Sequence, residues 1–180
     1  MKLLLFALTA FALPAQVTSD RLRQAPREPH NWLTYSGTYA SQRYTTLNDV
    51  TPANVRDLEL KWVFQAASFE KFEATPLVVD GILYTVQAPN DIVAINAATG
   101  RIYWTHSYTP SPDARVCCGR VNRGLAIHGD TLFMGTIDGR LIAVDAHTGK
   151  LVWKTAVARP EAGYSVTHAP LVIKDKVLVG

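Results

Sequence analysis

The chain has 180 residues, of which 48% are hydrophobic and 18% are charged, a composition typical of a folded domain and not of a disordered segment. Its formal net charge of +3 is small and scattered along the sequence, so charge gives no reason to expect binding to nucleic acid or to a membrane surface. No apolar run reaches the ~20 residues that span a bilayer.

The first residues differ from the rest of the chain. Lys2 precedes an apolar run over residues 3–13, and small or polar residues follow from Ala15 to Ser19. This order is typical of a secretory signal peptide. We therefore expect residues 1–19 to be a signal peptide that is cleaved between Ala15 and Ser19, residues 20–180 to form part of one domain, and the protein to be periplasmic.

A repeat of 46 to 49 residues runs through the remainder of the chain. Residues 92–104 return as residues 141–153, with Trp104 and Trp153 at the same place, and an upstream element at 76–84 returns at 124–133 and 170–178. Each unit holds four short β-branched or aromatic runs separated by turn signals, which predicts a four-stranded antiparallel sheet. Asp80-Gly81 and Asp138-Gly139 are typical of two-residue type I′ turns, in which both residues need a positive φ.

A sheet of this kind cannot bury both faces alone, so neighbouring units must stack on it, and an all-β fold of the β-propeller type is expected. A sandwich would lack a self-similar unit, and a helical solenoid would show a 3.6-residue period. We expect the tryptophans to pack between blades. From about residue 55 the chain should hold two complete blades, with Trp62 in the closing strand of a preceding blade and Gly180 inside the next. Propellers have 4–8 blades, so the chain is expected to be a fragment.

Residues 109–124 form an insertion that lengthens one repeat, and enlarged loops often carry function. The insertion contains Cys117 and Cys118, the only cysteines of the chain. In an oxidising compartment these two are expected to form a disulfide, with buried thiols as the alternative. A bond between adjacent cysteines cannot join distant segments, so it would serve locally as a rigid surface.

The Cys-Cys pair followed by Asn122-Arg123-Gly124, together with the tryptophan-bearing repeat, resembles the pyrroloquinoline quinone (PQQ) dependent methanol and ethanol dehydrogenase family. The resemblance covers residues 31–180. It implies an eight-bladed propeller enzyme that oxidises small alcohols by hydride transfer to the quinone and passes electrons to a cytochrome c, separate or fused downstream. The chain has no Gly-x-Gly-x-x-Gly or Walker sequence, which argues against nicotinamide or nucleotide use.

The resemblance also implies roles for five residues. Cys117 and Cys118 match a disulfide that lies against the quinone ring, and Arg123 matches an arginine that hydrogen-bonds the quinone oxygens. Glu73 matches a glutamate that contacts the cofactor near the propeller axis, and Thr167 matches a threonine that binds a cofactor carboxylate. These residues precede an innermost strand or lie in the enlarged loop, so they should converge on the central channel.

In the family a calcium or lanthanide ion assists the quinone. Its ligands and the aspartate base are expected beyond Gly180, so we assign no catalytic or metal-binding residue, and the fragment alone is expected to be inactive. His168 has no second ligand at metal-binding spacing and is interpreted as an ordinary polar residue. The alternative is a non-enzymatic propeller of the outer-membrane assembly lipoprotein type. Those proteins begin with a lipidated cysteine, and no cysteine precedes Cys117.

Overall fold

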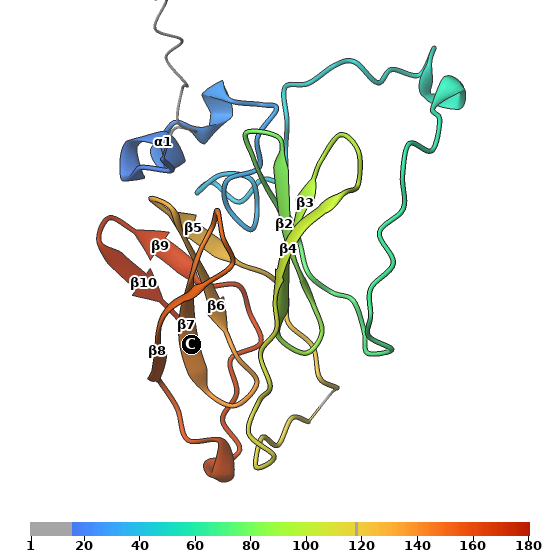
Figure 1. The fold of residues 1–180 in the computed structure, drawn as a ribbon. Coiled ribbons are helices and arrows are strands. Elements are labelled where there is room, and N and C mark those ends of the chain that lie inside the picture. Colours follow the sequence, from blue (N-terminus) through green and yellow to red (C-terminus); the bar gives the residue numbers. More distant parts are fainter. Residues whose placement is uncertain (1–15, 118) are drawn as a thin grey trace, which may run out of the picture.

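The structure, a computed structural model, describes residues 16–117 and 119–180, whose strands form two four-stranded antiparallel sheets and one hairpin (Figure 1). The first sheet consists of β1 (Leu77–Val79), β2 (Ile82–Gln87), β3 (Asp91–Asn96) and β4 (Ile102–His106). The second consists of β5 (Ala126–His128), β6 (Thr131–Gly135), β7 (Arg140–Asp145) and β8 (Leu151–Ala156). The hairpin consists of β9 (Leu171–Ile173) and β10 (Lys176–Leu178). The predicted propeller blades, two complete and one begun, are thereby confirmed.

Short helices connect these sheets or precede them. They are the α-helix α1 (Ser19–Arg23) and the 3₁₀ segments η1 (Ala25–Arg27), η2 (Val55–Asp57) and η3 (Pro160–Ala162). In the described part of the chain no helix has the length and apolar character needed to cross a membrane.

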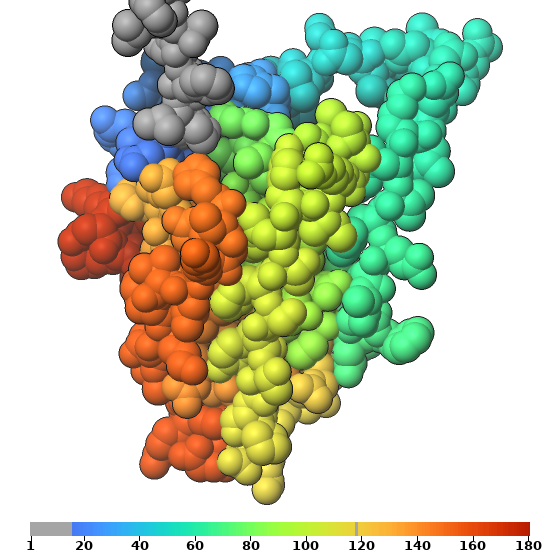
Figure 2. Space-filling model, in the orientation of Figure 1, coloured from blue at the N-terminus to red at the C-terminus, as the bar shows by residue number. Residues whose placement is uncertain are grey.

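The middle strands of both sheets are buried on both faces. In β3, Ile92 and Ala94 are 0% exposed and Val93 and Ile95 are 1% exposed, and the middle residues of β7 are equally buried. Side chains alternate between the two faces of a strand, so a strand without an exposed face must be covered on both sides. Figure 2 shows the two sheets in contact along their length. Burial of each valine or isoleucine contributes roughly 1.5–3 kcal/mol, which makes this stacking the main source of stability.

Two of the repeat tryptophans, Trp104 and Trp62, dock on the following sheet, as predicted. Trp104 donates its indole N–H to the carbonyl of Ala146 at 3.2 Å, and its ring lies so close to Gly149 that a Cβ there would come within 2.6 Å. Trp62 repeats the arrangement one blade earlier, with the carbonyl of Ala97 at 3.0 Å and Gly100 under its ring. Trp104 and Trp153 both pair with an alanine of the neighbouring strand, so their places in the two sheets are equivalent.

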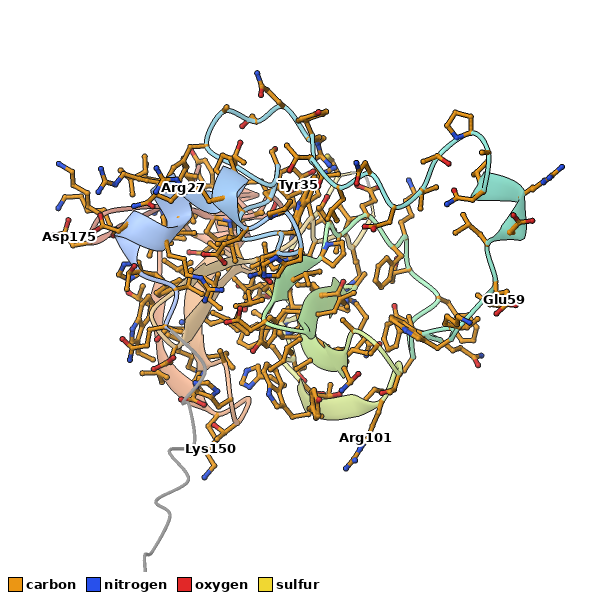
Figure 3. All side chains as sticks on the ribbon, turned by 90° about the horizontal axis from the view of Figure 1, so that it is seen from above. Arg27, Tyr35, Glu59, Arg101, Lys150 and Asp175 are labelled. Carbon is orange, nitrogen blue, oxygen red and sulfur yellow. The ribbon has the colours of Figure 1, made fainter. Side chains whose placement is uncertain are left out.

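The prediction that blades begin near residue 55 was wrong, because the first strand begins at Leu77. Between Val55–Asp57 and Leu77 no strand is present, although Trp62 docks as a closing strand would. A strand needs a hydrogen-bonded neighbour, and in the described part of the chain this segment has only the single bridge from Thr75 to Gly124. Leu60 and Val63 are accordingly 82% and 72% exposed. Seen from above, Glu59 stands apart from the sheets, whereas Arg101 and Lys150, equivalent in the repeat, both lie on their outer side (Figure 3).

One of the two predicted type I′ turns is present. Asp80 and Gly81 have φ values of 49° and 82°, as this turn requires. The prediction for Asp138-Gly139 was wrong, because Gly139 has a positive φ of 71° and Asp138 does not. The reason is loop length: β6 ends at Gly135 and β7 begins at Arg140, so the connection is longer than two residues.

The N-terminal segment packs on the sheets at the end opposite to the enlarged loop (Figure 1). Arg21 binds Glu28 at 2.7 Å and Asp80 at 2.5 Å, which ties α1 to the β1–β2 turn. Hydrogen bonds from Arg21 are the main cause of the lowered pKa of both carboxyls, and they also raise the pKa of Arg21. Residues 1–15 of the predicted signal peptide lie outside the described residues, so the signal peptide stays a prediction.

Candidate cofactor site at the inner strands

Three of the predicted site residues come together. Glu73, Arg123 and Thr167 each precede the innermost strand of a different sheet or hairpin, β1, β5 and β9. The Arg123 guanidinium lies 3.1 Å from the carboxylate of Glu73 and donates a hydrogen bond of 3.0 Å to the hydroxyl of Thr167. The structure therefore brings these three residues into contact with one another. Their position in a central channel and their contact with a cofactor remain predictions.

Backbone hydrogen bonds fix Arg123 between its two neighbours. The backbone N–H of Thr75 donates to the carbonyl of Arg123 at 3.0 Å, and the N–H of Arg123 donates to the carbonyl of Thr167 at 2.9 Å. Thr75 and Gly124 also form a parallel bridge. The start of each inner strand is thus bound to the next, and the Arg123 side chain projects from a backbone held on both sides.

The residues on either side of Arg123 explain the Asn-Arg-Gly sequence. Asn122 is 1% exposed; its amide donates to the carbonyl of Gly135 at 2.7 Å, and its side-chain oxygen accepts the N–H of Gly124 at 2.9 Å. Gly124 has a φ of 141°, and a Cβ there would lie 2.9 Å from the carbonyl oxygen of Thr75. The tripeptide is visible in the sequence, but the burial of Asn122 and the need for glycine at position 124 become evident only in the structure.

The charged groups of the site remain accessible. The side chains of Arg123 and Glu73 are 41% and 36% exposed, and an ion pair of such exposure contributes about 0–1 kcal/mol to stability. Arg123 can therefore bind another anion at little cost. A planar permanent cation next to a hydroxyl is a donor set that suits carboxylate and quinone oxygens, so these residues fit a planar anionic cofactor such as PQQ. Glu73 reaches Arg123 directly, and its contact with a cofactor remains a prediction.

The cysteine-bearing segment lies beside this cluster. A Cβ on Gly119 would be 4.0 Å from the Lys71 side chain, in the segment that leads to Glu73. Cys117 is exposed. Cys118 lies outside the described residues, so the disulfide and its stacking role remain predictions. Among the described residues no group of three or more His, Cys, Asp or Glu side chains is arranged to hold a metal ion.

Asp138, predicted only as a turn residue, holds the start of the enlarged loop. Its buried carboxylate, 2% exposed, accepts the Tyr108 hydroxyl at 2.9 Å and the Ser111 N–H at 3.0 Å, and also the Thr136 hydroxyl. Burial alone would raise the pKa of Asp138, but the hydrogen bonds from Thr136, Ser111 and Tyr108 hold it below its usual value. Burial and the same contact raise the pKa of Tyr108 to about 12.

Comparison with known proteins agrees with this geometry. The protein-family model described as "PQQ: Glucose/ethanol/alcohol dehydrogenase, beta-propeller domain" matches residues 32–180. The quinohemoprotein alcohol dehydrogenase ADH IIB of Pseudomonas putida is 40% identical over 171 residues, which cover 94% of this chain and 25% of that protein. The chain thus spans about a quarter of the length of that curated relative.

Solved structures of alcohol dehydrogenases are also similar to this chain. A europium-containing methanol dehydrogenase superposes with a TM-score of 0.85 at 40% identity, covering 89% of this chain and 29% of that one. BamB from Moraxella catarrhalis superposes with a TM-score of 0.53 at 19% identity over 66% of this chain and 36% of its own, which bears on the fold alone. The family match over residues 32–180 decides the assignment: the chain belongs to the PQQ family of glucose, ethanol and alcohol dehydrogenase β-propellers.

Proposed function

We propose that the full-length protein is a PQQ-dependent alcohol dehydrogenase and that this chain supplies part of its cofactor site. The observation that carries the proposal is the meeting of Arg123 with Glu73 and Thr167, at 3.1 and 3.0 Å, from three consecutive inner strands. Bound PQQ would supply the acceptor for the hydride that leaves the alcohol.

In this proposal Arg123 binds the cofactor oxygens. Its guanidinium stays charged throughout and presents a planar set of donors, so it binds an oxygen more strongly as negative charge develops there. Glu73 orients the guanidinium from one side, and the Thr167 hydroxyl is placed to donate to a cofactor carboxylate. Cys117 and Cys118, as a disulfide, would cover one face of the ring.

The remaining parts of the function concern the full-length protein. We propose a small alcohol as substrate and a calcium or lanthanide ion as the metal. The europium in the name of the similar methanol dehydrogenase supports the lanthanide. We propose a cytochrome c as electron acceptor, which is supported by the quinohemoprotein name of the Pseudomonas relative. The signal sequence supports a periplasmic location.

The test is substitution of Arg123 in the full-length protein loaded with PQQ and metal. Arg123→Leu should lower kcat for alcohol-dependent dye reduction by about 10²–10³, because one preorganised donor to developing charge is lost, and Arg123→Lys should lie between. The absorbance of the bound quinone should show that both variants still carry PQQ. Arg120→Leu, an exposed arginine of the same loop, is the matched control and should keep the parent rate. An Arg123→Leu enzyme at the parent rate would contradict the proposal.

A further inference from the structure

The enlarged loop between β4 and β5 is bound at both of its ends to one turn of the second sheet. Tyr108 and Ser111, near its start, bind Asp138 at 2.9 and 3.0 Å. Asn122, near its end, donates to the carbonyl of Gly135 at 2.7 Å. Gly135 is the last residue of β6 and Asp138 lies in the β6–β7 connection. The same turn region therefore binds the loop near both of its ends.

The turn is itself fixed from the first sheet. The Asn90 side chain accepts the N–H of Ile137 at 3.1 Å and donates to the carbonyl of Gly135 at 3.3 Å, and Asn90 is 0% exposed. The position of the β6–β7 turn relative to the first sheet is therefore set by buried hydrogen bonds. Such bonds are costly to break, because the groups left behind have no water to replace the lost partner.

Asp138 is the charged member of this arrangement. Its carboxylate is buried and Arg140, the nearest cation in the described contacts, lies 3.7 Å away, too far for a strong hydrogen bond. The negative charge of Asp138 is therefore stabilised mainly by the hydrogen bonds from Tyr108, Ser111 and Thr136. A buried carboxylate without such donors would be strongly unfavourable, so the loop and the carboxylate stabilise each other.

We propose that Asp138 is a positioning residue that holds the cysteine-bearing loop, residues 108–124, over the cofactor site. The inference rests on the proposed function. Between its two anchored ends the described part of the loop is mostly exposed. The Ala114 N–H donates to the carbonyl of Ser111 at 3.1 Å, and the N–H of Ser111 is the group that binds Asp138. Loss of the Asp138 contacts frees the segment that carries Cys117 while leaving the four-stranded sheets intact.

The experiment uses the full-length protein with the substitutions Asp138→Asn and Tyr108→Phe. Asparagine cannot accept from all three donors, and phenylalanine removes one hydroxyl without changing shape. Hydrogen exchange in peptides covering 108–116 should become about 10- to 100-fold faster for Asp138→Asn and about fivefold faster for Tyr108→Phe. PQQ affinity, measured by titration of the apoprotein, should fall in the same order. Exchange within β2 and β3 should not change.

Asp145→Asn is the matched control. Asn96 stands at the equivalent place in the first sheet. Each of the two side chains accepts the backbone N–H groups of the residues two and three positions later, so asparagine is compatible with this position. Should Asp138→Asn not fold, Tyr108→Phe decides alone. A parent without PQQ affinity overturns the proposed function. A parent that binds PQQ, with variants that bind it equally well or exchange no faster in the loop, overturns only the positioning role.

A separate observation concerns the start of the mature chain. The sequence predicts signal peptide cleavage somewhere between Ala15 and Ser19. Val17 is 1% exposed and exchanges two backbone hydrogen bonds with Gly129, at 2.9 and 3.2 Å. Thr18 caps α1 by accepting the N–H of Arg21, and the Ser19 hydroxyl binds His128 at 3.1 Å. Cleavage after Ser19 would remove all of these contacts.

We infer that the signal peptidase hydrolyses the Ala15–Gln16 bond, so that water adds its hydroxyl to the Ala15 carbonyl and a proton to the Gln16 nitrogen. Gln16 then remains to donate to Asp130 at 2.7 Å. Intact mass and N-terminal sequencing of the exported full-length protein test this. A chain that begins at Gln16, or the same chain less one ammonia after cyclisation, supports the inference. A chain that begins after Val17, or one that retains residues 1–15, overturns it.

Discussion

The two four-stranded sheets share one frame. In both, the pairing between the third and fourth strands shifts register at the same place, between Ala94 and Ile95 and between Ala143 and Val144. The sheets differ in the turns between their second and third strands. The β2–β3 turn presents the buried Asn90, whereas the β6–β7 turn presents Asp138 and receives the enlarged loop. The repeat supplies the frame, and the departures from it position the candidate site.

The tryptophans give a second contrast. Trp104 is docked on the following sheet, whereas the Trp153 ring contacts Phe133 of its own sheet at 5.9 Å and Trp153 is 40% exposed. The two indoles have the same local surroundings within their sheets. Docking therefore depends on a following sheet, and its stabilising effect belongs to the interface between sheets.

The largest effect is expected from breaking this docking at Gly149. Gly149→Ala places a Cβ 2.6 Å from the Trp104 ring at a φ of 71°. We expect a loss of about 3 kcal/mol in the free energy of unfolding of the full-length protein, from steric overlap together with left-handed backbone strain. Urea denaturation measures it.

Gly163→Ala is the control for backbone strain. Gly163 has a similar φ of 83°, and a Cβ there would have no neighbour within 4 Å. Gly163→Ala should therefore lower the free energy of unfolding by about 1 kcal/mol, from backbone strain alone. Equal losses in the two variants would mean that the contact between Trp104 and Gly149 does not hold the sheets together.

Much of this frame could be predicted from the sequence, because it depends on local signals. Strand runs, the Asp80-Gly81 turn and the spacing of the tryptophans all repeat along the chain. The exceptions have physical causes. The segment around Trp62 has the strand pattern, but no described strand pairs with its backbone. The Asp138 turn depends on a loop length that the dipeptide alone does not reveal.

The next effect concerns the N-terminal clasp, in which Arg21 binds Glu28 and Asp80. The Arg21 side chain is largely buried, at 13% exposed. Arg21→Leu therefore leaves the carboxylates of Glu28 and Asp80 without their cationic partner. We expect a loss of about 2 kcal/mol in unfolding free energy at pH 7. Arg23→Leu removes an exposed pair with Asp20, 68% and 71% exposed, and should change stability by less than about 0.5 kcal/mol. Similar losses for both would refute the clasp.

The clasp should also depend on pH. The pKa values of Glu28 and Asp80 are lowered from 4.5 and 3.8, chiefly by hydrogen bonds from Arg21. A carboxyl with a lowered pKa in the folded state stabilises fully above its ordinary pKa and loses this contribution as pH falls through the folded value. The difference between parent and Arg21→Leu should therefore be constant above about pH 5 and shrink below about pH 4. Denaturation curves at several pH values would show a constant difference if the pairing were unimportant.

The candidate site was only partly predictable. Arg123, Glu73 and Thr167 were placed by resemblance to a family, and the structure brings them together. The role of Asp138 beyond its turn could not be predicted, because its partners Tyr108 and Ser111 lie 30 and 27 residues away in the enlarged connection between β4 and β5. Long-range contacts of this kind carry no period that sequence analysis can detect.

The smallest effect is expected where the two sheets are interchangeable. Asn96 and Asp145 accept backbone N–H groups at equivalent turns, so Asp145→Asn should change the unfolding free energy at pH 7 by less than about 0.5 kcal/mol. The pKa of Asp145 is lowered, chiefly by the Thr148 hydroxyl, so its contribution is present above its ordinary pKa of 3.8 and is lost as pH falls through the folded value. Asn96→Asp should introduce the same acid sensitivity, and Asp145→Asn should remove it. Unfolding measured at pH 7 and pH 3 checks both. A large loss at pH 7 for either substitution would show that the two turns are not equivalent, and that the repeat conceals a difference between the sheets.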